Sequence, residues 1–386
     1  MKHIKFRQYL LIFLFLGLLF FPMLNKSNFL LKDSENTENR EPAPKPELTM
    51  KNLDPFPLQY EKFYNDHFSL RQRLMKSYYD LNLLVYHKTP IPDQVVLGKN
   101  NWLFLGGDEV DVYTGKNRFS SEELNTLKKE LEYRQNYLAK QGIKFYFVIA
   151  PVKATVYGEN MPENIIKLHE ESGGKQLVHY LNQNSTVTCI DLYPIMKRYK
   201  QSGLLYFKND NHWTKRGAFI GAMQIVKTIQ YDFPTLNILS LDSMRINSTI
   251  TTTGNLTAML SKTKLFVDTI IELTPKNGFC TNEIQKVGYP VVKGFPYPWE
   301  YEMVREQKDT TLPKLLLISD SFGGNLFPYI SEPFSRSVKI FDSWQYKLNE
   351  EIVKAEKPDV VVLIVLESNI RNMFKFLSIN KVSDIK

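Results

Sequence analysis

Short, almost continuously apolar runs recur along this chain and alternate with segments that have helical periodicity. Three of the clearest runs are Lys144–Ala150, Lys314–Ile318 and Val360–Leu366. A run of this kind fits a strand that is buried on both faces, as in a parallel sheet with helices on either side. The alternation of such strands with helices predicts an α/β fold with a mostly parallel sheet and flanking helices.

The clearest helix is predicted to begin after Ser120, because Ser120 and Glu123 form a capping-box pattern ahead of leucines that recur on one face. Arg134 interrupts that face, and we expect its stem to follow the apolar stripe with its charge at the rim. Residues 236–305 break the strand–helix rhythm and are predicted to be an insertion packed on the sheet edge, a candidate lid or substrate-facing surface. Residues 55–386 then form one folded domain.

The first 26 residues combine a basic lead (Lys2, Lys5 and Arg7) with an almost wholly apolar run from Tyr9 to Leu24. This pattern predicts an N-terminal membrane helix acting as a signal-anchor, with a cleaved signal peptide as the alternative. Residues 27–54 are polar and proline-bearing, which is typical of a flexible tether. Because positive flanks stay in the cytoplasm, we expect the body to lie outside it, on the periplasmic or extracellular face.

The formal net charge is +8, and the first 26 residues carry four of the basic groups and no acid. The rest of the chain has only a weak positive excess and no RNA-binding motif, so nucleic-acid binding is not indicated. The two cysteines, Cys189 and Cys280, could form one disulfide or remain two buried thiols. The six histidines show no ligand spacing, and neither a metal nor another cofactor is predicted.

Two short polar segments about a hundred residues apart supply a carboxylate, an imidazole and a hydroxyl. Asp210 and His212 lie two residues apart ahead of a predicted helix, and Ser321 follows the apolar run that ends at Ile318. A serine nucleophile needs these three groups together. Taken separately, each segment also has a structural explanation: Asp210 as a helix cap beside a solvated histidine, and Ser321 in a polar turn.

These segments together resemble the alginate O-acetyltransferase type of SGNH hydrolase-like protein, the AlgJ and AlgX proteins and the related DHHW family. The pieces that carry the resemblance, in order, are Gly98–Phe104, Ala150–Tyr157, Asp210–Trp213 with Gly217-Ala218, Gly254–Leu256, Ser319–Phe322 and Pro358–Arg371. The set covers about Gln59 to Arg371. Two departures are Ser319, where the family usually has the glycine of G-D-S, and Asn255, where it usually has the aspartate of G-D-L.

The resemblance implies an SGNH-hydrolase-like fold whose triad order, Asp then His then Ser, is circularly permuted relative to ordinary SGNH esterases. It implies Ser321 as nucleophile, His212 as general base and Asp210 as the group that orients the imidazole. Trp213, Lys153, Asn255 and Arg371 are the candidate substrate-binding residues. The implied partners are a polysaccharide acceptor and a membrane-bound O-acyltransferase that delivers the acetyl donor, with the N-terminal helix holding the domain at the membrane.

Three functions remain open at this stage. The first is an extracytoplasmic O-acetyltransferase that modifies hydroxyls of a cell-surface or secreted polysaccharide. The second is a polysaccharide acetyl esterase, because the same acyl-serine could be passed to water. The third is a non-catalytic carbohydrate-binding or assembly protein that keeps the fold.

Overall fold

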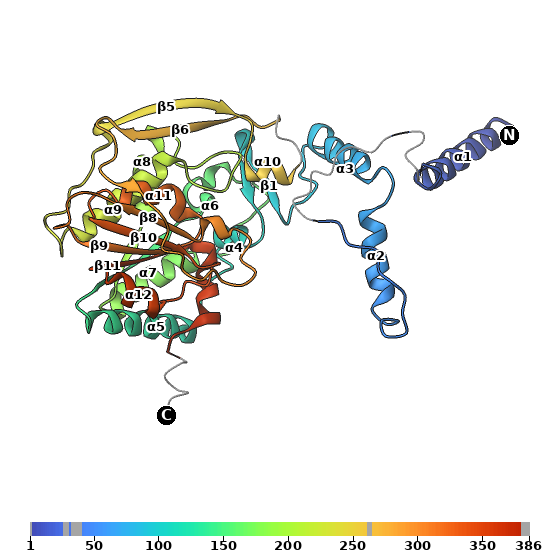
Figure 1. The fold of residues 1–386 in the computed structure, drawn as a ribbon. Helices are drawn as coiled ribbons and strands as arrows, with labels where there is room; N and C mark the ends of the chain where they lie inside the picture. The colour runs from blue at the N-terminus through green and yellow to red at the C-terminus, as the bar shows by residue number, and fades with distance from the viewer. Residues whose placement is uncertain (1, 26–30, 32–40, 261–264, 380–386) are drawn as a thin grey trace. The chain divides into compact units, whose positions relative to one another are not determined.

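The computed structural model describes residues 2–25, 31, 41–260 and 265–379 (Figure 1). The chain divides into two compact units, residues 1–91 with a short piece at 259–261, and residues 92–258 with 262–386. The first unit contains α1 (Lys2–Leu24), α2 (Phe56–Asp66), α3 (Arg71–Asp80) and the π-helix η1 (Leu81–Val85). Of the predicted tether, residues 27–30 and 32–40 lie outside the described residues.

Helix α1 falls where the sequence predicts a membrane helix. Within the ranges given above, however, no helix is both long enough and apolar enough to cross a membrane.

The second unit is built on a seven-stranded sheet with the strand order β4-β3-β11-β9-β10-β8-β7. The first five strands in this order run parallel, and β8 pairs antiparallel with β10. The bounds of the sheet strands are β3 Lys144–Ala150, β4 Thr188–Asp191, β7 Asn282–Glu283, β8 Glu302–Glu306, β9 Lys314–Ser319, β10 Arg336–Phe341 and β11 Val360–Leu366. The prediction of an α/β fold with a mostly parallel sheet is confirmed.

Alternate residues of the central strands enter two separate cores, one on each face of the sheet. Tyr146 and Val148 of β3 belong to the core that contains α8, α9 and α11, whereas Phe145 and Phe147 belong to the core with α5, α7 and α12. Both faces are therefore buried, which explains why β3 and β11 are almost wholly apolar. The helices of this unit are α4 Asp108–Thr114, α5 Ser121–Ala139, α6 Lys153–Val156, α7 Gly173–Asn184, α8 Tyr193–Tyr199, α9 Lys215–Ile229, α10 Asn255–Met259, α11 Phe322–Ile330 and α12 Glu350–Glu356.

Two small antiparallel pairs accompany the main sheet. Strands β1 (Val95–Leu97) and β2 (Leu103–Leu105) form one pair, and β5 (Met244–Thr251) and β6 (Asp268–Pro275) form the other. The second pair lies within the predicted insertion, but β7 and β8 from the same stretch of sequence belong to the main sheet.

The capping box predicted at the start of α5 is present. The Ser120 hydroxyl accepts from the amide of Glu123, and the Glu123 carboxylate accepts from the amide of Ser120. The expectation for Arg134 on this helix is wrong, because its side chain is only 1% exposed. Its guanidinium pairs with Glu130 at 2.7 Å and donates to the carbonyl of Tyr346 at 2.6 Å, so its charge lies inside the fold.

Candidate active site

Ser321 lies at the turn between β9 and α11, at the carboxyl end of a central parallel strand. This edge is where open α/β sheets collect their reacting groups. Gly323 permits the tight turn, because a Cβ at that position would come within 1.9 Å of the Ser319 hydroxyl oxygen. Helix α11 can therefore begin directly after the strand, and the Ser321 side chain lines a cavity.

Asp210 and His212 lie on a tight loop that is closed by a β-bridge between Tyr206 and Trp213. The amide of Phe207 donates to the carbonyl of His212 at 3.2 Å across the base of this loop. Thr214 then caps α9, since its hydroxyl accepts from the amide three residues later. The loop is thus held at both ends, and Asp210 and His212 lie in its tip.

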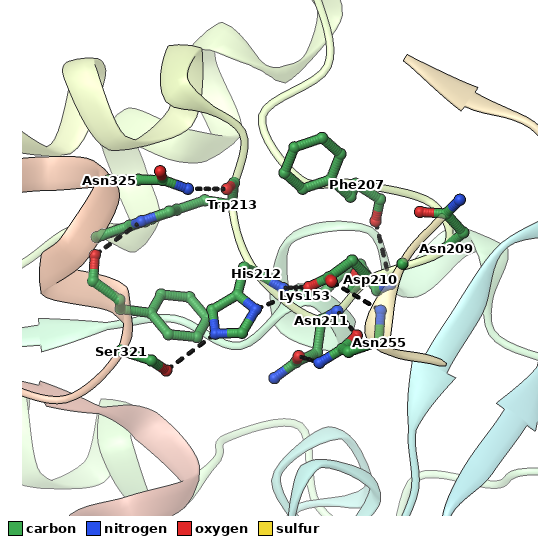
Figure 2. Close-up of polar contacts among 12 residues, drawn as sticks. Lys153, Phe207, Asn209, Asp210, Asn211, His212, Trp213, Asn255, Ser321 and Asn325 are labelled. Carbon is green, nitrogen blue, oxygen red and sulfur yellow. Dashed lines mark hydrogen bonds and ion pairs between the residues drawn. The ribbon is translucent and has the colours of Figure 1, made fainter. Parts of the chain in front are cut away.

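The structure brings the three predicted groups into one hydrogen-bonded series (Figure 2). Asp210 Oδ1 lies 2.7 Å from His212 Nδ1, and His212 Nε2 lies 2.9 Å from Ser321 Oγ. When Nδ1 donates its proton to Asp210, the lone pair of Nε2 is left to accept from the Ser321 hydroxyl. This geometry is suited to removing a proton from the serine.

The second carboxylate oxygen of Asp210 is held from the other side. The amide of Asn255 donates to Asp210 Oδ2 at 2.9 Å, and the side chains of Asn255 and Asn211 hydrogen-bond to one another. Gly254 lets this turn approach the loop, because a Cβ there would lie 2.4 Å from the carbonyl oxygen of Asn209. Both carboxylate oxygens of Asp210 are therefore fixed, which prevents the carboxylate from rotating away from the imidazole.

The hydrogen bonds set the protonation behaviour of the pair. Burial would raise the pKa of Asp210, but the bonds and charge of His212 and the amide of Asn255 outweigh it and lower the pKa to about 2. Burial would lower the pKa of His212, but the bond to Asp210 and its negative charge outweigh this effect and raise it. Asp210 is therefore ionised at neutral pH and favours a protonated imidazole, which is the state produced when His212 accepts a proton.

The cavity beside Ser321 has a volume of about 780 Å³. His212, Asn255 and Asn325 lie on its wall, together with side chains from several distant segments of the chain. These additional lining residues include Asp108, Glu109, Tyr297, Glu300, Asp320, Lys339, Trp344 and Asn369. A volume of this size accommodates a small organic ligand. Within the described ranges, no group of three His, Cys, Asp or Glu side chains could hold a metal ion.

Of the four predicted substrate-binding residues, only Asn255 lies on the cavity wall. Trp213 is fully buried and donates from Nε1 to the carbonyl of Phe322 at 3.0 Å, so it ties the His212 loop to the Ser321 turn. Lys153 is fully buried behind the loop. Arg371 does not line the cavity; its guanidinium pairs with Glu123 at 2.5 Å and donates to a backbone carbonyl at 2.7 Å.

Several site residues were not predicted from the sequence. Glu109, in α4, is 1% exposed, and neither of its carboxylate oxygens has a hydrogen-bond partner among the described residues. The nearby side chain of Asn211 acts to lower the pKa of Glu109. Burial has the larger effect, and it raises the pKa of Glu109. Asp320 is also buried but satisfied, since it accepts from the Tyr346 hydroxyl at 2.7 Å and the Phe322 amide at 2.8 Å. For Glu109, the only signal in the sequence is that it belongs to the acidic pair that follows Gly106-Gly107.

Comparison with known proteins agrees with the resemblance drawn from the motifs. The family model of the SGNH hydrolase-like domain of acetyltransferase AlgX matches residues 95–275, a range that includes Asp210 and His212 but ends before Ser321. Two curated relatives are named probable alginate O-acetylase AlgJ. The relative from Pseudomonas syringae is 26% identical over 175 residues, and that from Azotobacter vinelandii is 26% identical over 174 residues. Each match covers 45% of this chain and 42% of the relative, so the chain spans less than half the length of these relatives.

Among solved structures, Bacillus cereus PatB1 has the same fold, with a TM-score of 0.52 at 17% identity. The match covers 72% of this chain and 97% of PatB1. The circular permutation of the triad order stays a prediction. The chain resembles the AlgJ and AlgX type of SGNH hydrolase-like protein, and its residues 95–275 match the model of the SGNH hydrolase-like domain of acetyltransferase AlgX.

Proposed function

We propose that this chain is an O-acetyltransferase that moves an acetyl group from a donor to a hydroxyl of a polysaccharide, through an acyl-serine at Ser321. The observation that carries the proposal is the hydrogen-bonded series from Asp210 through His212 to Ser321 on the wall of one cavity. The family model for an acetyltransferase domain and the relatives named alginate O-acetylase support the reaction class and a polysaccharide acceptor.

In the first half of the reaction, Ser321 Oγ attacks the carbonyl carbon of the acetyl donor while His212 Nε2 takes its proton. The bond between Oγ and the acyl carbon forms, and the bond from that carbon to the leaving group breaks. The proton on His212 passes to the leaving group. Asp210 stays ionised throughout and stabilises the imidazolium, and the Ser321 amide is the candidate donor to the developing oxyanion.

In the second half, a sugar hydroxyl attacks the acyl carbon while His212 Nε2 takes the hydroxyl proton. The ester bond to Ser321 breaks, and Oγ recovers its proton from the imidazolium. Each general-base step contributes a factor of about 10² to 10⁴ to the rate. In this proposal the acceptor binds in the cavity that Ser321 and His212 line, and its hydroxyl competes with water for the acyl group.

The same proposal includes a location outside the cytoplasm and a membrane-bound O-acyltransferase as the source of acetyl groups. The basic lead at Lys2, Lys5 and Arg7 ahead of the apolar run supports the location. Fusion of a reporter enzyme that is active only outside the cytoplasm tests it. Co-purification from detergent extracts tests the partner.

The proposed chemistry is tested with an activated acetyl ester, p-nitrophenyl acetate, and the purified chain. We expect a burst of p-nitrophenol and an acetyl group that peptide mass spectrometry maps to Ser321. Ser321→Ala should give neither, and His212→Ala should slow acylation by about 10² or more. A burst that survives in folded Ser321→Ala protein would refute Ser321 as the nucleophile.

Acetylation of the cell's polysaccharide separates the transferase from the two alternatives. Mass spectrometry of the polymer from a deletion strain should show loss of acetyl groups, whereas a gain of acetyl groups would indicate the esterase. Complementation with Ser321→Ala should not restore acetylation. If it restores acetylation fully, the chain acts as a non-catalytic binding or assembly protein.

A further inference from the structure

Lys153 is a fully buried cation that lies directly behind the loop carrying Asp210 and His212 (Figure 2). It begins α6, three residues after the end of β3. Its Nζ donates to three carbonyl oxygens of the loop: that of Phe207 at 3.1 Å, that of Lys208 at 3.3 Å and that of Asp210 at 2.7 Å. The side chain of Lys153 thus holds the backbone of the loop at three points.

The number of bonds matches the chemistry of the ammonium group. A lysine has three N–H donors and no acceptor, and a buried ammonium is costly unless its donors are satisfied. All three donors are used by one short stretch of backbone, so any displacement of the loop leaves a buried donor unpaired. The loop is therefore restrained in position as well as in conformation.

The ammonium group of Lys153 is surrounded by two aromatic rings and by carboxylates whose charge favours it. Its Nζ lies 5.9 Å from the ring centroid of Trp102 and 5.3 Å from that of Phe104, within the range of a cation–π contact. Glu109 from α4 and Asp268 from β6 contribute favourable charge, as does Asp210 itself. Lys153 does not line the cavity, so it has no route to substrate in this structure.

We propose that Lys153 is a positioning residue, which sets the backbone of Asp210 so that its carboxylate meets the His212 imidazole in line with Ser321. It acts through the backbone carbonyl of Asp210 and touches neither donor nor acceptor. The inference rests on the proposed function for its kinetic readout, but its structural readout does not depend on that function.

The test compares Lys153→Met with Lys200→Met. Lys200 is the control, because its Nζ also donates to a backbone carbonyl, that of Val156 at 2.8 Å, and lies 5.4 Å from the ring centroid of Tyr157. It differs from Lys153 in being half-buried, in pairing with Glu159 at 2.8 Å and in making no hydrogen bond to the loop. A misplacement of about 1 Å at a reacting group costs about a hundredfold in rate. Lys153→Met should therefore lower the rate of Ser321 acylation by p-nitrophenyl acetate by about a hundredfold through kcat, with little change in KM. Lys200→Met should not.

The structural readout is the proton NMR signal of His212 Nδ1–H, which moves far downfield when it is shared with a carboxylate. This signal should broaden or disappear in Lys153→Met and persist in Lys200→Met. If the unmodified chain shows the signal but never acylates, the proposed function fails while the role of Lys153 is still measured. A folded Lys153→Met protein with a normal signal, or with a kcat within about twofold of the unmodified chain, would overturn the inference.

If Lys153→Met does not fold, Lys153→Arg carries the test. A guanidinium keeps the charge but presents its donors in a planar fork, which cannot match three carbonyls arranged around an ammonium. We expect the kcat of acylation to fall by about tenfold and the His212 signal to shift. An unchanged rate and signal would show that charge alone is sufficient, and would overturn positioning by three-point contact.

Discussion

The most informative perturbation outside the hydrogen-bonded series is Lys339→Met on β10. Lys339 is 1% exposed and lines the cavity. Among the described residues its Nζ has neither a hydrogen bond nor an ion pair, and it lies 5.5 Å from the ring centroid of Phe341. Burial lowers its pKa to about 8, although the charges of Glu300 and Asp320 act in the opposite direction. Methionine preserves the length of the side chain and removes the charge, so the change isolates the cost of burying an ammonium.

The size of that cost follows from the pKa. The ordinary value is 10.5 and the folded value is about 8, and each unit is worth about 1.36 kcal/mol, so the charge costs about 3 kcal/mol. Because the folded pKa is the lower one, the unfolded chain binds more protons between these two values. The full cost applies below pH 8 and disappears as the pH rises to about 10.5. Lys339→Met should therefore raise the free energy of unfolding by up to about 3 kcal/mol at pH 7, and by little near pH 10.5.

Urea unfolding at several pH values between 7 and 10.5 measures this effect. The matched control is Lys354→Met, because Lys354 is exposed on α12 and its replacement should change stability by less than about 0.5 kcal/mol. The reasoning is refuted if Lys339→Met is no more stable than the unmodified chain at pH 7. A gain in stability that is the same at all pH values would also refute it, since packing and not charge would then be responsible.

Three further predictions follow from the geometry. The pKa of Asp210 is lowered from 3.8 to about 2, so its ionised form adds about 2 kcal/mol to the free energy of unfolding. This contribution is present above pH 3.8 and is lost as the pH falls through 2. Asp210→Asn should remove it at pH 7, and urea unfolding at pH 7 and pH 2 checks this. Gly254→Ala should lower both the melting temperature and the acylation rate, because its Cβ would meet the Asn209 carbonyl at 2.4 Å; unchanged values for both contradict the close approach. Cys189 and Cys280 are both free thiols, so a reducing agent should leave the melting temperature unchanged, as calorimetry would show.

The central strands could be predicted because their own residues specify them. Lys144–Ala150 and Val360–Leu366 coincide with β3 and β11, since strands covered on both faces need apolar side chains at nearly every position. The capping box of α5 was predictable for the same reason, because its two partners lie three residues apart. In each case the information that decides the structure is local in the sequence.

The surroundings of the site could not be predicted, because they depend on contacts between distant segments. The guanidinium of Arg134 is buried because the carbonyl of Tyr346 receives it, and the two residues are 212 positions apart. Asp320 is likewise satisfied by the hydroxyl of Tyr346, which follows a different strand. The sequence near Arg134 and Asp320 does not identify these partners. Charged side chains are usually exposed, so burial of these two is not expected from the sequence.

The same distinction explains why the sequence predicts Lys153 to be a substrate-binding residue. A lysine just past the end of a parallel strand is at the correct edge of the sheet for a ligand. Its actual partners are backbone carbonyls, which every residue possesses and which therefore leave no trace in the sequence. Asp210 and His212 could be found because their side chains carry the chemistry, whereas the group that holds them could be identified only once the path of the loop was known. Sequence alone thus identifies the reacting groups more readily than the residues that hold them in position.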